Sequence, residues 1–274
     1  MIATRKLSET VGATVLDVDR DRLLNDPAVV VGVLEALEDN GVLVFPQIGV
    51  TDEEQVTFSR RLGTLALRPE RPIPELTQIT QDPGSINADY FRGNLYWHAD
   101  GMLDEKPSKA GILTAHVLAP GDGGTEFAST YAAFDDLPPA SKERLDGLRV
   151  AHTLEATQRP FHPDPTPEQL DEWRSSRPAR EHPLVWNHRS GRRSMVLGAT
   201  ADYIVGMDVD EGRALLAELL AEATRPSRVI RHDWSVGDLV IWDNTGVMHR
   251  VTDYDPTSPR ELHRTTVVGD EHIQ

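Results

Sequence analysis

The chain of 274 residues contains no cysteine. This absence excludes disulfide bonds, a thiolate nucleophile, and zinc or iron-sulfur sites built from cysteine, so any metal ion must be held by His, Asp or Glu. Long apolar runs are also missing, because no segment approaches the roughly 20 residues that span a bilayer. Residues 1–6 lead into a polar segment instead of the apolar stretch of a secretion signal. We therefore expect a soluble, cytoplasmic protein with no membrane partner.

Positive charge is scarce as well. Lys plus Arg number 28 against 44 Asp plus Glu, which gives a formal net charge of -16. Such a chain is a poor partner for nucleic acid or an anionic membrane, and solubility is the simplest explanation of the charge. No repeat, low-complexity tract or charged tail marks a linker. We predict one domain over residues 1–274, long enough to bury a sizeable core.

Helix signals occupy the first quarter of the chain. Asp26 and Pro27 provide an N-cap and a first-turn proline, apolar residues then recur at helical spacing, and Gly41 ends the predicted helix. A strand is expected over 42–45. The next helix opens with a capping-box pattern at residue 51 and runs towards residue 63.

From about residue 95 the sequence changes to short β-like runs separated by Gly and Pro. A leucine-rich helix at about 210–224 interrupts the series. The runs themselves cover 111–118, 148–153, 184–187, 194–197, 228–232, 238–242 and 260–268. Many short strands with one inserted helix favour a mainly β fold with flanking helices around a double-stranded β-helix, or jelly roll. The helical and β N-terminal portion should pack on this core.

Two histidines and one aspartate form a candidate metal site. His98 and Asp100 lie in Trp-His-Ala-Asp at 97–100, after a β-like run at 95–97, and residues i and i+2 of a strand share a face. His249, on a facing strand, would complete the set. Two imidazoles and a carboxylate can occupy one face of Fe(II) and leave positions open for a co-substrate and O2. The alternative is that both histidines are hydrogen-bonded core residues.

A second pair has the same spacing. Prolines surround His162 and Asp164 and remove the strand hydrogen bonds that a rigid site needs, so we reject this pair. The other histidines lack a carboxylate at ligand spacing and a distal partner, so we expect core or surface roles for His116, His152, His182, His188, His232, His263 and His272. The glycines at 121–124 are followed by neither Lys-Ser/Thr nor a helix, which favours a turn over a phosphate loop.

Several motifs together resemble the taurine dioxygenase and 2,4-dichlorophenoxyacetate dioxygenase family of Fe(II)- and 2-oxoglutarate-dependent enzymes. The similarity runs from about residue 41 to residue 269 and is strongest at 97–100, 123–127 and 237–264. One position departs from the family pattern. Many relatives have Arg after Trp-Asp-Asn, whereas this chain has Thr245, so the surroundings of the distal histidine should differ.

The resemblance implies that the two histidines and the aspartate described above bind iron. It also implies that Thr125 and Arg260 hold the distal carboxylate of 2-oxoglutarate, and that Arg264 lies beside the co-substrate or the substrate anion. A guanidinium suits a carboxylate because its planar fork forms two parallel charge-assisted hydrogen bonds. Arg260 and Arg264 are four residues apart and would share a face of a strand. For an arbitrary arginine in so acidic a chain, a surface salt bridge is the alternative.

The same resemblance suggests a substrate pocket. Arg68 stands where the taurine-cleaving relatives carry a sulfonate-contacting histidine, and Asn94 matches a substrate-contacting position. Together with Arg264 they would make a cationic pocket for a small organic anion, covered by a lid at 82–92 from which Tyr90 would contact the substrate. The alternative for Tyr90 is that it caps the hydrophobic edge. The alternatives are a solvated loop for Arg68 and a turn residue for Asn94.

The implied activity is hydroxylation of a small anion, coupled to conversion of 2-oxoglutarate and O2 into succinate and CO2. The last third of the chain resembles the phenoxyacetate enzymes, which favours an aryloxy- or alkyl-carboxylate, with a sulfonate or alkyl sulfate as the alternative. A zinc hydrolase using the same three ligands and a non-catalytic jelly roll that binds a small anion are rival classes. The family includes dimers and tetramers, so a homo-oligomer is among the expected states.

Overall fold

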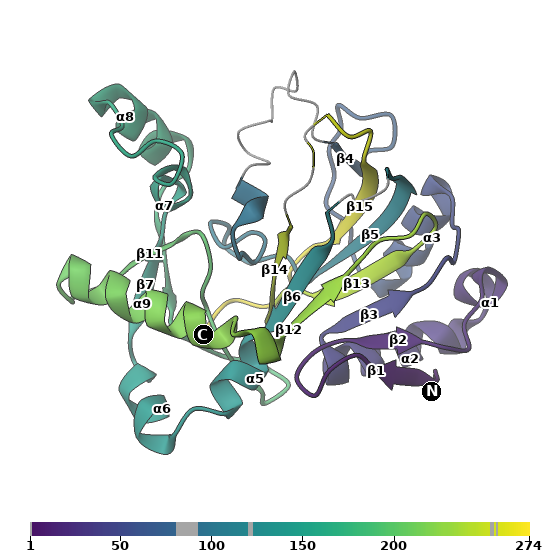
Figure 1. The fold of residues 1–274 in the computed structure, drawn as a ribbon, viewed down its shortest axis with the longest axis horizontal. Coiled ribbons are helices and arrows are strands. Elements are labelled where there is room, and N and C mark those ends of the chain that lie inside the picture. Colours follow the sequence, from purple (N-terminus) through teal and green to yellow (C-terminus); the bar gives the residue numbers. More distant parts are fainter. Residues whose placement is uncertain (1, 81–92, 120–122, 253–254, 256) are drawn as a thin grey trace.

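The computed structural model describes residues 2–80, 93–119, 123–252, 255 and 257–274. Its largest sheet has seven strands and combines segments from both ends of the chain (Figure 1). In spatial order these are β1 (Thr4–Lys6), β2 (Ala13–Val15), β3 (Val42–Phe45), β13 (Leu239–Asp243), β5 (Ala110–Val117), β15 (Glu261–Val267) and β4 (Thr77–Thr80). All the neighbours pair antiparallel except β2 and β3, which run parallel.

Three smaller sheets complete the β structure of the described residues. One has the order β12 (Val229–His232), β6 (Thr125–Ser129) and β14 (Val247–Val251), and it lies beside the large sheet in the middle of Figure 1. The others are β11 (Ala201–Ile204), β7 (Arg149–His152) and β8 (Arg180–Pro183), and the pair β10 (Arg193–Met195) and β9 (Val185–Asn187).

The helices flank these sheets. In Figure 1 the first three lie around the large sheet, and the others lie on the opposite side of the molecule. Their bounds are α1 (Arg20–Asn25), α2 (Pro27–Asn40), α3 (Asp52–Leu62), α5 (Thr130–Asp135), α6 (Pro139–Leu145), α7 (Leu154–Gln158), α8 (Pro167–Ser176) and α9 (Val209–Ala223), with short 3-10 turns η1 (Gly93–Leu95) and η2 (Pro226–Arg228). No helix in the described ranges is long and apolar enough to cross a membrane.

Local sequence signals explain the first helices. The Asp26 side chain accepts a hydrogen bond from the backbone N of Ala28 at 2.9 Å, and Gly41 ends α2 in the left-handed region at φ 70°. Thr51 and Glu54 form both hydrogen bonds of a capping box at the start of α3. Both helices were predicted, and both predictions are confirmed.

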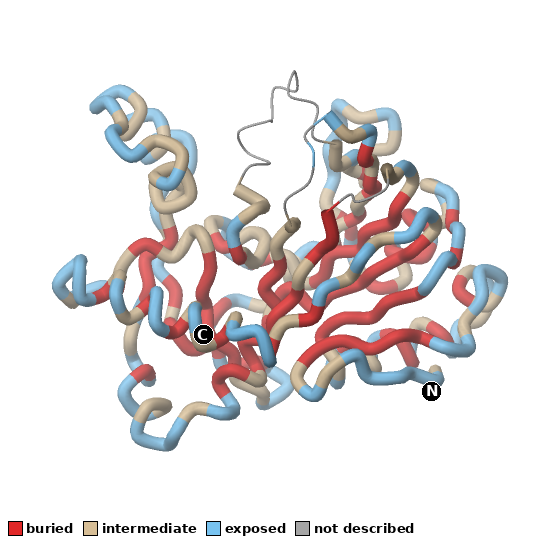
Figure 2. Tube along the Cα trace, in the orientation of Figure 1, coloured by how far each residue is buried: buried red, intermediate tan, exposed pale blue. Residues whose placement is uncertain are grey.

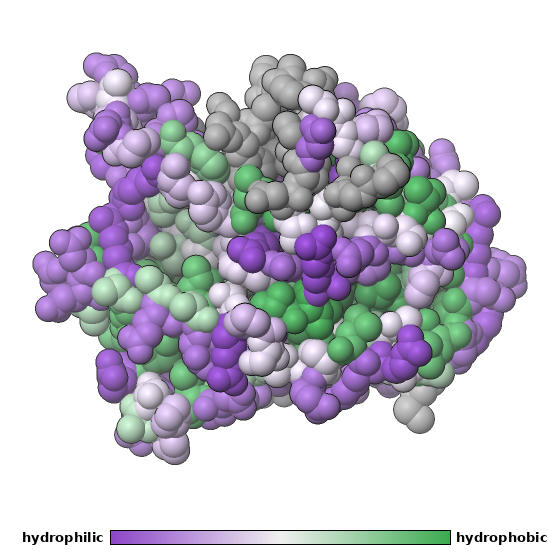
Figure 3. Space-filling view, in the orientation of Figure 1, coloured by the Kyte–Doolittle hydropathy of each residue, from purple (hydrophilic) through white to green (hydrophobic). Residues whose placement is uncertain are grey.

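Apolar strands form the core. Every residue of β3 and β13 is buried, and Figure 2 shows buried trace along both the large sheet and the smaller sheets. The predicted runs correspond to β3, β5, β7, β9, β10, β12, β13 and β15, and the predicted leucine-rich helix is α9. By contrast, α8 buries no residue, and Figure 3 shows a largely hydrophilic surface around it.

The predicted strand at 95–97 is wrong. Gly93 and Asn94 open the 3-10 turn η1, and Tyr96 donates its backbone N–H to the carbonyl of Gly93 at 3.1 Å. The turn preferences of Gly and Asn outweigh the β propensity of the apolar residues that follow. His98 therefore reaches the sheet from a turn instead of a strand.

Candidate active site

His98 and His249 are brought together by their backbones. His249 lies in β14, whereas His98 lies outside the named strands. The two residues form an isolated antiparallel bridge. The N–H of His98 donates to the carbonyl of His249 at 3.0 Å, and the N–H of His249 donates to the carbonyl of His98 at 2.9 Å. Their rings consequently lie with centroids 4.2 Å apart.

Asp100 completes the predicted triad. Its carboxylate oxygens lie 4.0 Å from Nε2 of His98 and 3.6 Å from Nε2 of His249. One donor atom from each of the three residues falls within 4.8 Å of the others, a spacing that could hold a metal ion. The structure therefore brings together all three residues that the sequence selected.

The two imidazoles are in the form that binds metals. Nδ1 of His98 lies 2.8 Å from the carbonyl oxygen of Tyr96, which can only accept, so Nδ1 carries the proton and Nε2 presents its lone pair. Burial lowers the pKa of His98. It also lowers the pKa of His249, helped by the charge of His98. Both rings are therefore neutral at neutral pH.

Arg264 holds the Asp100 carboxylate. Its Nη1 and Nη2 lie 3.3 and 2.5 Å from the two carboxylate oxygens, a forked pair. Burial alone would raise the pKa of Asp100, but Arg264, and then His249 and His98, outweigh burial and lower it. Asp100 is therefore an anion, as metal binding requires. The sequence placed Arg264 beside a ligand anion, and in the structure its side chain pairs with Asp100.

Asn244 fixes the backbone around Asp100 and was not selected from the sequence. Its Oδ1 accepts from the N–H of Asp100 at 2.8 Å, and its Nδ2 donates to the carbonyls of Asp100 at 2.9 Å and Ser108 at 2.8 Å. Only 1% of Asn244 is exposed. Its position after Trp-Asp in the quoted motif was the available signal, because a buried amide needs several partners.

A small cavity of about 60 Å³ opens beside the histidines. Thr125, Arg260 and Arg264, the three predicted co-substrate residues, all line it. Thr125 begins β6, and its hydroxyl oxygen accepts from Nε1 of Trp234 at 3.0 Å. Arg260 and Arg264 were predicted to share one face of a strand, and both line this cavity.

A larger cavity of about 530 Å³ adjoins the first and shares Asn94 and Arg264 with it. Asp100 and the exposed Arg68 also line it, so three of the predicted substrate residues meet there. The sequence did not select Arg71 or Lys106, which lie in the same lining. The fourth predicted residue, Tyr90, and the proposed lid at 82–92 lie outside the described residues.

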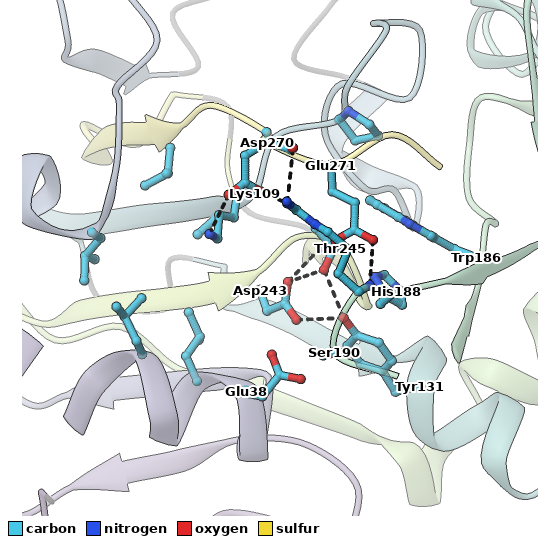
Figure 4. A pocket seen from close by; sticks show the side chains of 18 residues that line it. Glu38, Lys109, Tyr131, Trp186, His188, Ser190, Asp243, Thr245, Asp270 and Glu271 are labelled. Carbon is cyan, nitrogen blue, oxygen red and sulfur yellow. Dashed lines mark hydrogen bonds and ion pairs between the residues drawn. The ribbon is translucent and has the colours of Figure 1, made fainter. Parts of the chain in front are cut away.

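Thr245, the residue that departs from the family pattern, lines a separate cavity of about 370 Å³ (Figure 4). Thr245 donates its N–H and hydroxyl to Oδ1 of Asp243 at 3.0 and 2.6 Å, and Tyr131 donates its hydroxyl to Oδ2 at 3.1 Å. Burial raises the pKa of Asp243. Thr245 thus contacts Asp243 and Tyr131, and its side chain lies away from the metal ligands.

The structure contradicts the prediction that the remaining histidines lack a carboxylate neighbour. Nδ1 of His263 lies 2.6 Å from Asp52, and Nε2 of the same ring lies 2.6 Å from Glu261. His116 lies 3.5 Å from Asp52. His263 and His116 therefore do have carboxylate neighbours, and so do His232, 3.1 Å from Asp238, and His272, 3.7 Å from Glu105. Glu261 and His263 are two residues apart, the spacing of His98 and Asp100, and this was the signal that sequence reasoning missed.

Comparison with known proteins identifies the family. The family model described as Taurine catabolism dioxygenase TauD, TfdA family matches residues 3–266. The chain is 38% identical over 260 residues to the alpha-ketoglutarate-dependent 2,4-dichlorophenoxyacetate dioxygenase of Burkholderia sp. (strain RASC), covering 89% of this chain and 86% of the relative. It is 34% identical over 253 residues to the alpha-ketoglutarate-dependent sulfate ester dioxygenase of Pseudomonas putida, covering 89% and 82%.

A solved structure supports the same conclusion. The crystal structure of AAD-2 in complex with Mn(II) and N-oxalylglycine aligns with a TM-score of 0.85 and 32% identity over 100% of both chains. The chain therefore belongs to the TauD/TfdA family, and it is an Fe(II)- and 2-oxoglutarate-dependent dioxygenase.

Proposed function

We propose that this dioxygenase hydroxylates a small organic anion, and that an aryloxy- or alkyl-carboxylate is the favoured substrate. The observation that carries the proposal is the 530 Å³ cavity beside Asp100. Its lining includes Arg68, Arg71 and Lys106, none of which has an ion-pair partner within the described part of the chain. The lining also holds the carboxylates Glu70, Glu75, Asp100 and Asp104, and the last three are paired with Arg60, Arg264 and Arg177. Cations without such partners in a concave site attract anions. The relative that acts on 2,4-dichlorophenoxyacetate supports a carboxylate with an aryloxy body.

The iron ligands in this proposal are Nε2 of His98, Nε2 of His249 and the Asp100 carboxylate. Two neutral imidazoles and one anionic oxygen fit Fe(II) well and leave other coordination positions open. When bound, iron supplies the activation of O2 and the oxidative decarboxylation of 2-oxoglutarate to succinate and CO2. The task of the chain is to hold these donors and the two organic reactants in place.

Thr125 and Arg260 are proposed to bind the distal carboxylate of 2-oxoglutarate. The Thr125 oxygen already accepts from Trp234, so its hydroxyl proton can be donated to a carboxylate in the cavity. Arg260 is only 4% exposed, and a buried guanidinium forms strong paired hydrogen bonds with a carboxylate. Arg264 orients Asp100 and, because it lines both cavities, also attracts the substrate anion.

A sulfate ester is the second candidate substrate, ahead of a sulfonate. The relative named as a sulfate ester dioxygenase supports it, and arginine recognises sulfate and carboxylate oxygens with the same donors. In either case the charged end of the substrate would lie towards Arg68 and Asn94. The C–H bond that reacts would lie towards the metal.

We also infer a double-stranded β-helix core and a single domain over residues 1–274. Support comes from the large sheet, in which the N-terminal strands β1, β2 and β3 continue directly into β13, β5, β15 and β4. The AAD-2 alignment over the full chain supports the same inference. A cytoplasmic location, a homo-oligomeric state and the lack of a nucleic acid or membrane partner remain predictions from the sequence.

The proposal is tested by a panel of aryloxyacetates, alkyl carboxylates, alkyl sulfates, sulfonates and amino acids. Each is incubated with the enzyme, Fe(II), 2-oxoglutarate and O2, and succinate is measured. We expect succinate above the substrate-free level with aryloxy- or alkyl-carboxylates first and sulfates second. Succinate formed only with amino acids, or with no member of the panel, would contradict the substrate assignment.

The same assay separates the rival classes. A zinc hydrolase would turn over its substrate without O2 and without 2-oxoglutarate, whereas the oxygenase requires both. A non-catalytic anion-binding protein would bind a panel member and form no succinate. O2 uptake in step with succinate release supports the oxygenase alone.

A further inference from the structure

A second group of metal-binding side chains lies on the other face of the large sheet. His263 is in β15, His116 is in β5, and Asp52 is the first residue of α3. One donor atom from each falls within 4.8 Å of the others. Leu262 and Arg264, the neighbours of His263, line the cavity beside the iron triad, whereas His263 does not. Side chains alternate along a strand, so this group faces away from that cavity.

The strand pairing directs the side chain of His116 towards Asp52 and His263. In the β5–β15 ladder Leu262 pairs with Ala115, while the preceding Glu261 pairs with Val117. His116 is therefore the extra residue of a β-bulge, a feature that redirects a side chain. Its ring stacks on that of His263 with centroids 3.8 Å apart, and its Nε2 lies 3.5 Å from Oδ1 of Asp52.

Glu261 supplies the outer partner that metal-binding histidines usually have. Its Oε1 lies 2.6 Å from Nε2 of His263 and accepts a hydrogen bond there, while Nδ1 faces Oδ1 of Asp52 at 2.6 Å. A carboxylate that accepts from the far nitrogen of a ligating histidine fixes the ring and its tautomer. Burial and the neighbouring His263 lower the pKa of His116, which favours its neutral form.

We propose that Asp52, His116 and His263 form a second site, for Zn²⁺ or a chemically similar divalent transition-metal ion. The donors are Oδ1 of Asp52, Nε2 of His116 and Nδ1 of His263, and water takes the fourth position. Zinc with N and O donors at about 2.0–2.2 Å separates tetrahedral ligands by about 3.4 Å. The Asp52–His116 contact already has this length, and the Asp52–His263 contact has to lengthen by about 0.8 Å.

Metal binding at this site releases a proton. Without metal, both nitrogens of His263 face carboxylate oxygens that can only accept, so both carry protons. The Thr114 hydroxyl donates to Oε1 of Gln55, so Nε2–H of His116 donates a hydrogen bond to the Thr114 oxygen. The ion replaces the proton on Nδ1 of His263, which leaves to solvent, whereas neutral His116 keeps its single ring proton by moving it from Nε2 to Nδ1. The side chains of Asp52 and His116 are each 27% exposed, which gives the ion a path from solvent.

The experiment is an anaerobic titration of the full chain with Co²⁺, a probe for zinc sites, followed by visible absorption and metal analysis. We expect two bound equivalents in the wild type, one in His116→Ala, one in His98→Ala and none in the double variant. His272→Ala is the matched control, because its side chain is 45% exposed and lies 3.7 Å from a single carboxylate. It should keep two equivalents. Glu261→Gln should weaken the second site by about 10- to 100-fold.

Two results would overturn the proposal: a wild type that binds a single equivalent, or a His116→Ala variant that still binds two. If His116→Ala does not fold, Asp52→Asn replaces it and should also bind one metal equivalent. This variant keeps the start of α3, because the N-cap of the helix is Thr51. Failure of the iron-ligand assignment has a different signature, since His98→Ala would then keep both equivalents. Proton release, measured by calorimetry in buffers of different ionisation enthalpy, should fall with loss of the second site.

Discussion

The backbones of His98 and His249 hydrogen-bond to each other in both directions, at 3.0 and 2.9 Å, although the residues lie far apart in the sequence. The separation of the two imidazoles is therefore set by main-chain geometry and does not depend on long flexible side chains. Asn244 holds the backbone of Asp100 in the same way. All three proposed ligands are thus pre-positioned before any metal binds.

Gly198 lies against this arrangement and is sensitive to substitution. Its φ is +114°, and an added Cβ would lie 3.0 Å from the carbonyl oxygen of Trp97 and 3.1 Å from Cα of His98. Gly198→Ala should therefore displace His98 and weaken Fe(II) binding, measured by anaerobic titration. Gly191→Ala is the matched control, because φ is +87° there and the space is open. It should cost about 1–2 kcal/mol of stability and leave iron affinity unchanged. Equal iron affinities in the two variants would contradict this account.

Asn244→Ala removes three hydrogen bonds that hold the Asp100 segment. We expect stability to fall by about 1–3 kcal/mol, because buried backbone partners are left unpaired. Iron affinity should fall by about 10- to 100-fold. Chemical denaturation and anaerobic iron titration measure the two effects. Asn187→Ala removes an exposed amide with one long contact of 3.4 Å and should change neither quantity. Unchanged iron binding in Asn244→Ala would refute the positioning role.

Arg68 and Arg260 should affect different reactants. Arg68 is exposed, so Arg68→Gln should raise the KM for the anionic substrate only about 2- to 5-fold, and added salt should reduce the difference. Arg260→Gln, at a buried position, should weaken 2-oxoglutarate binding by about 2–5 kcal/mol. Steady-state kinetics with each reactant varied in turn measure both effects. A rise in the KM for 2-oxoglutarate in Arg68→Gln would contradict the assignment.

His152 makes stability depend on pH. Burial, and then the charge of His182, lower its pKa from 6.5 to about 3. Below pH 6.5 the unfolded chain takes up a proton that the folded chain does not, so stability is complete above 6.5 and falls as pH decreases. Between pH 7.5 and 5 this residue should remove about 2 kcal/mol.

His152→Gln isolates this contribution. The variant should lose about 2 kcal/mol less than the wild type over the same pH range, measured by urea denaturation at each pH. His272→Gln, at an exposed position, should keep the wild-type pH dependence. An unchanged pH dependence in His152→Gln would show that His152 is not responsible.

Short-range signals explain which parts of the fold could be predicted. The capping box at Thr51, the cap at Asp26 and the stop at Gly41 involve residues within a few positions of each other, and all three form as expected. Apolar periodicity similarly identified β3, β5, β13 and β15. Sheet order could not be read in this way, because β13 pairs with β3 and β5 through contacts between distant segments.

Some residues of the candidate site could likewise be predicted from the sequence, and others could not. Residue spacing and family motifs selected His98, Asp100 and His249, and the structure brings them within metal-binding distance. They did not reveal the ion pair of Arg264 with Asp100, because that pair spans 164 positions. The group of His116 and His263 was missed partly because the two-residue spacing of Glu261 and His263 was overlooked, and partly because the third member of the group is distant in the sequence. Its carboxylate, Asp52, lies at the start of a distant helix.

The most direct test of the iron site is the visible spectrum after anaerobic addition of Fe(II) and 2-oxoglutarate. We predict a charge-transfer band in the wild type, because iron held by His98, Asp100 and His249 would contact the co-substrate. The band should be absent in His98→Ala. It should be retained in His116→Ala, because His116 lies outside the iron site. No band in the wild type, or an equal band in His98→Ala, would contradict the account.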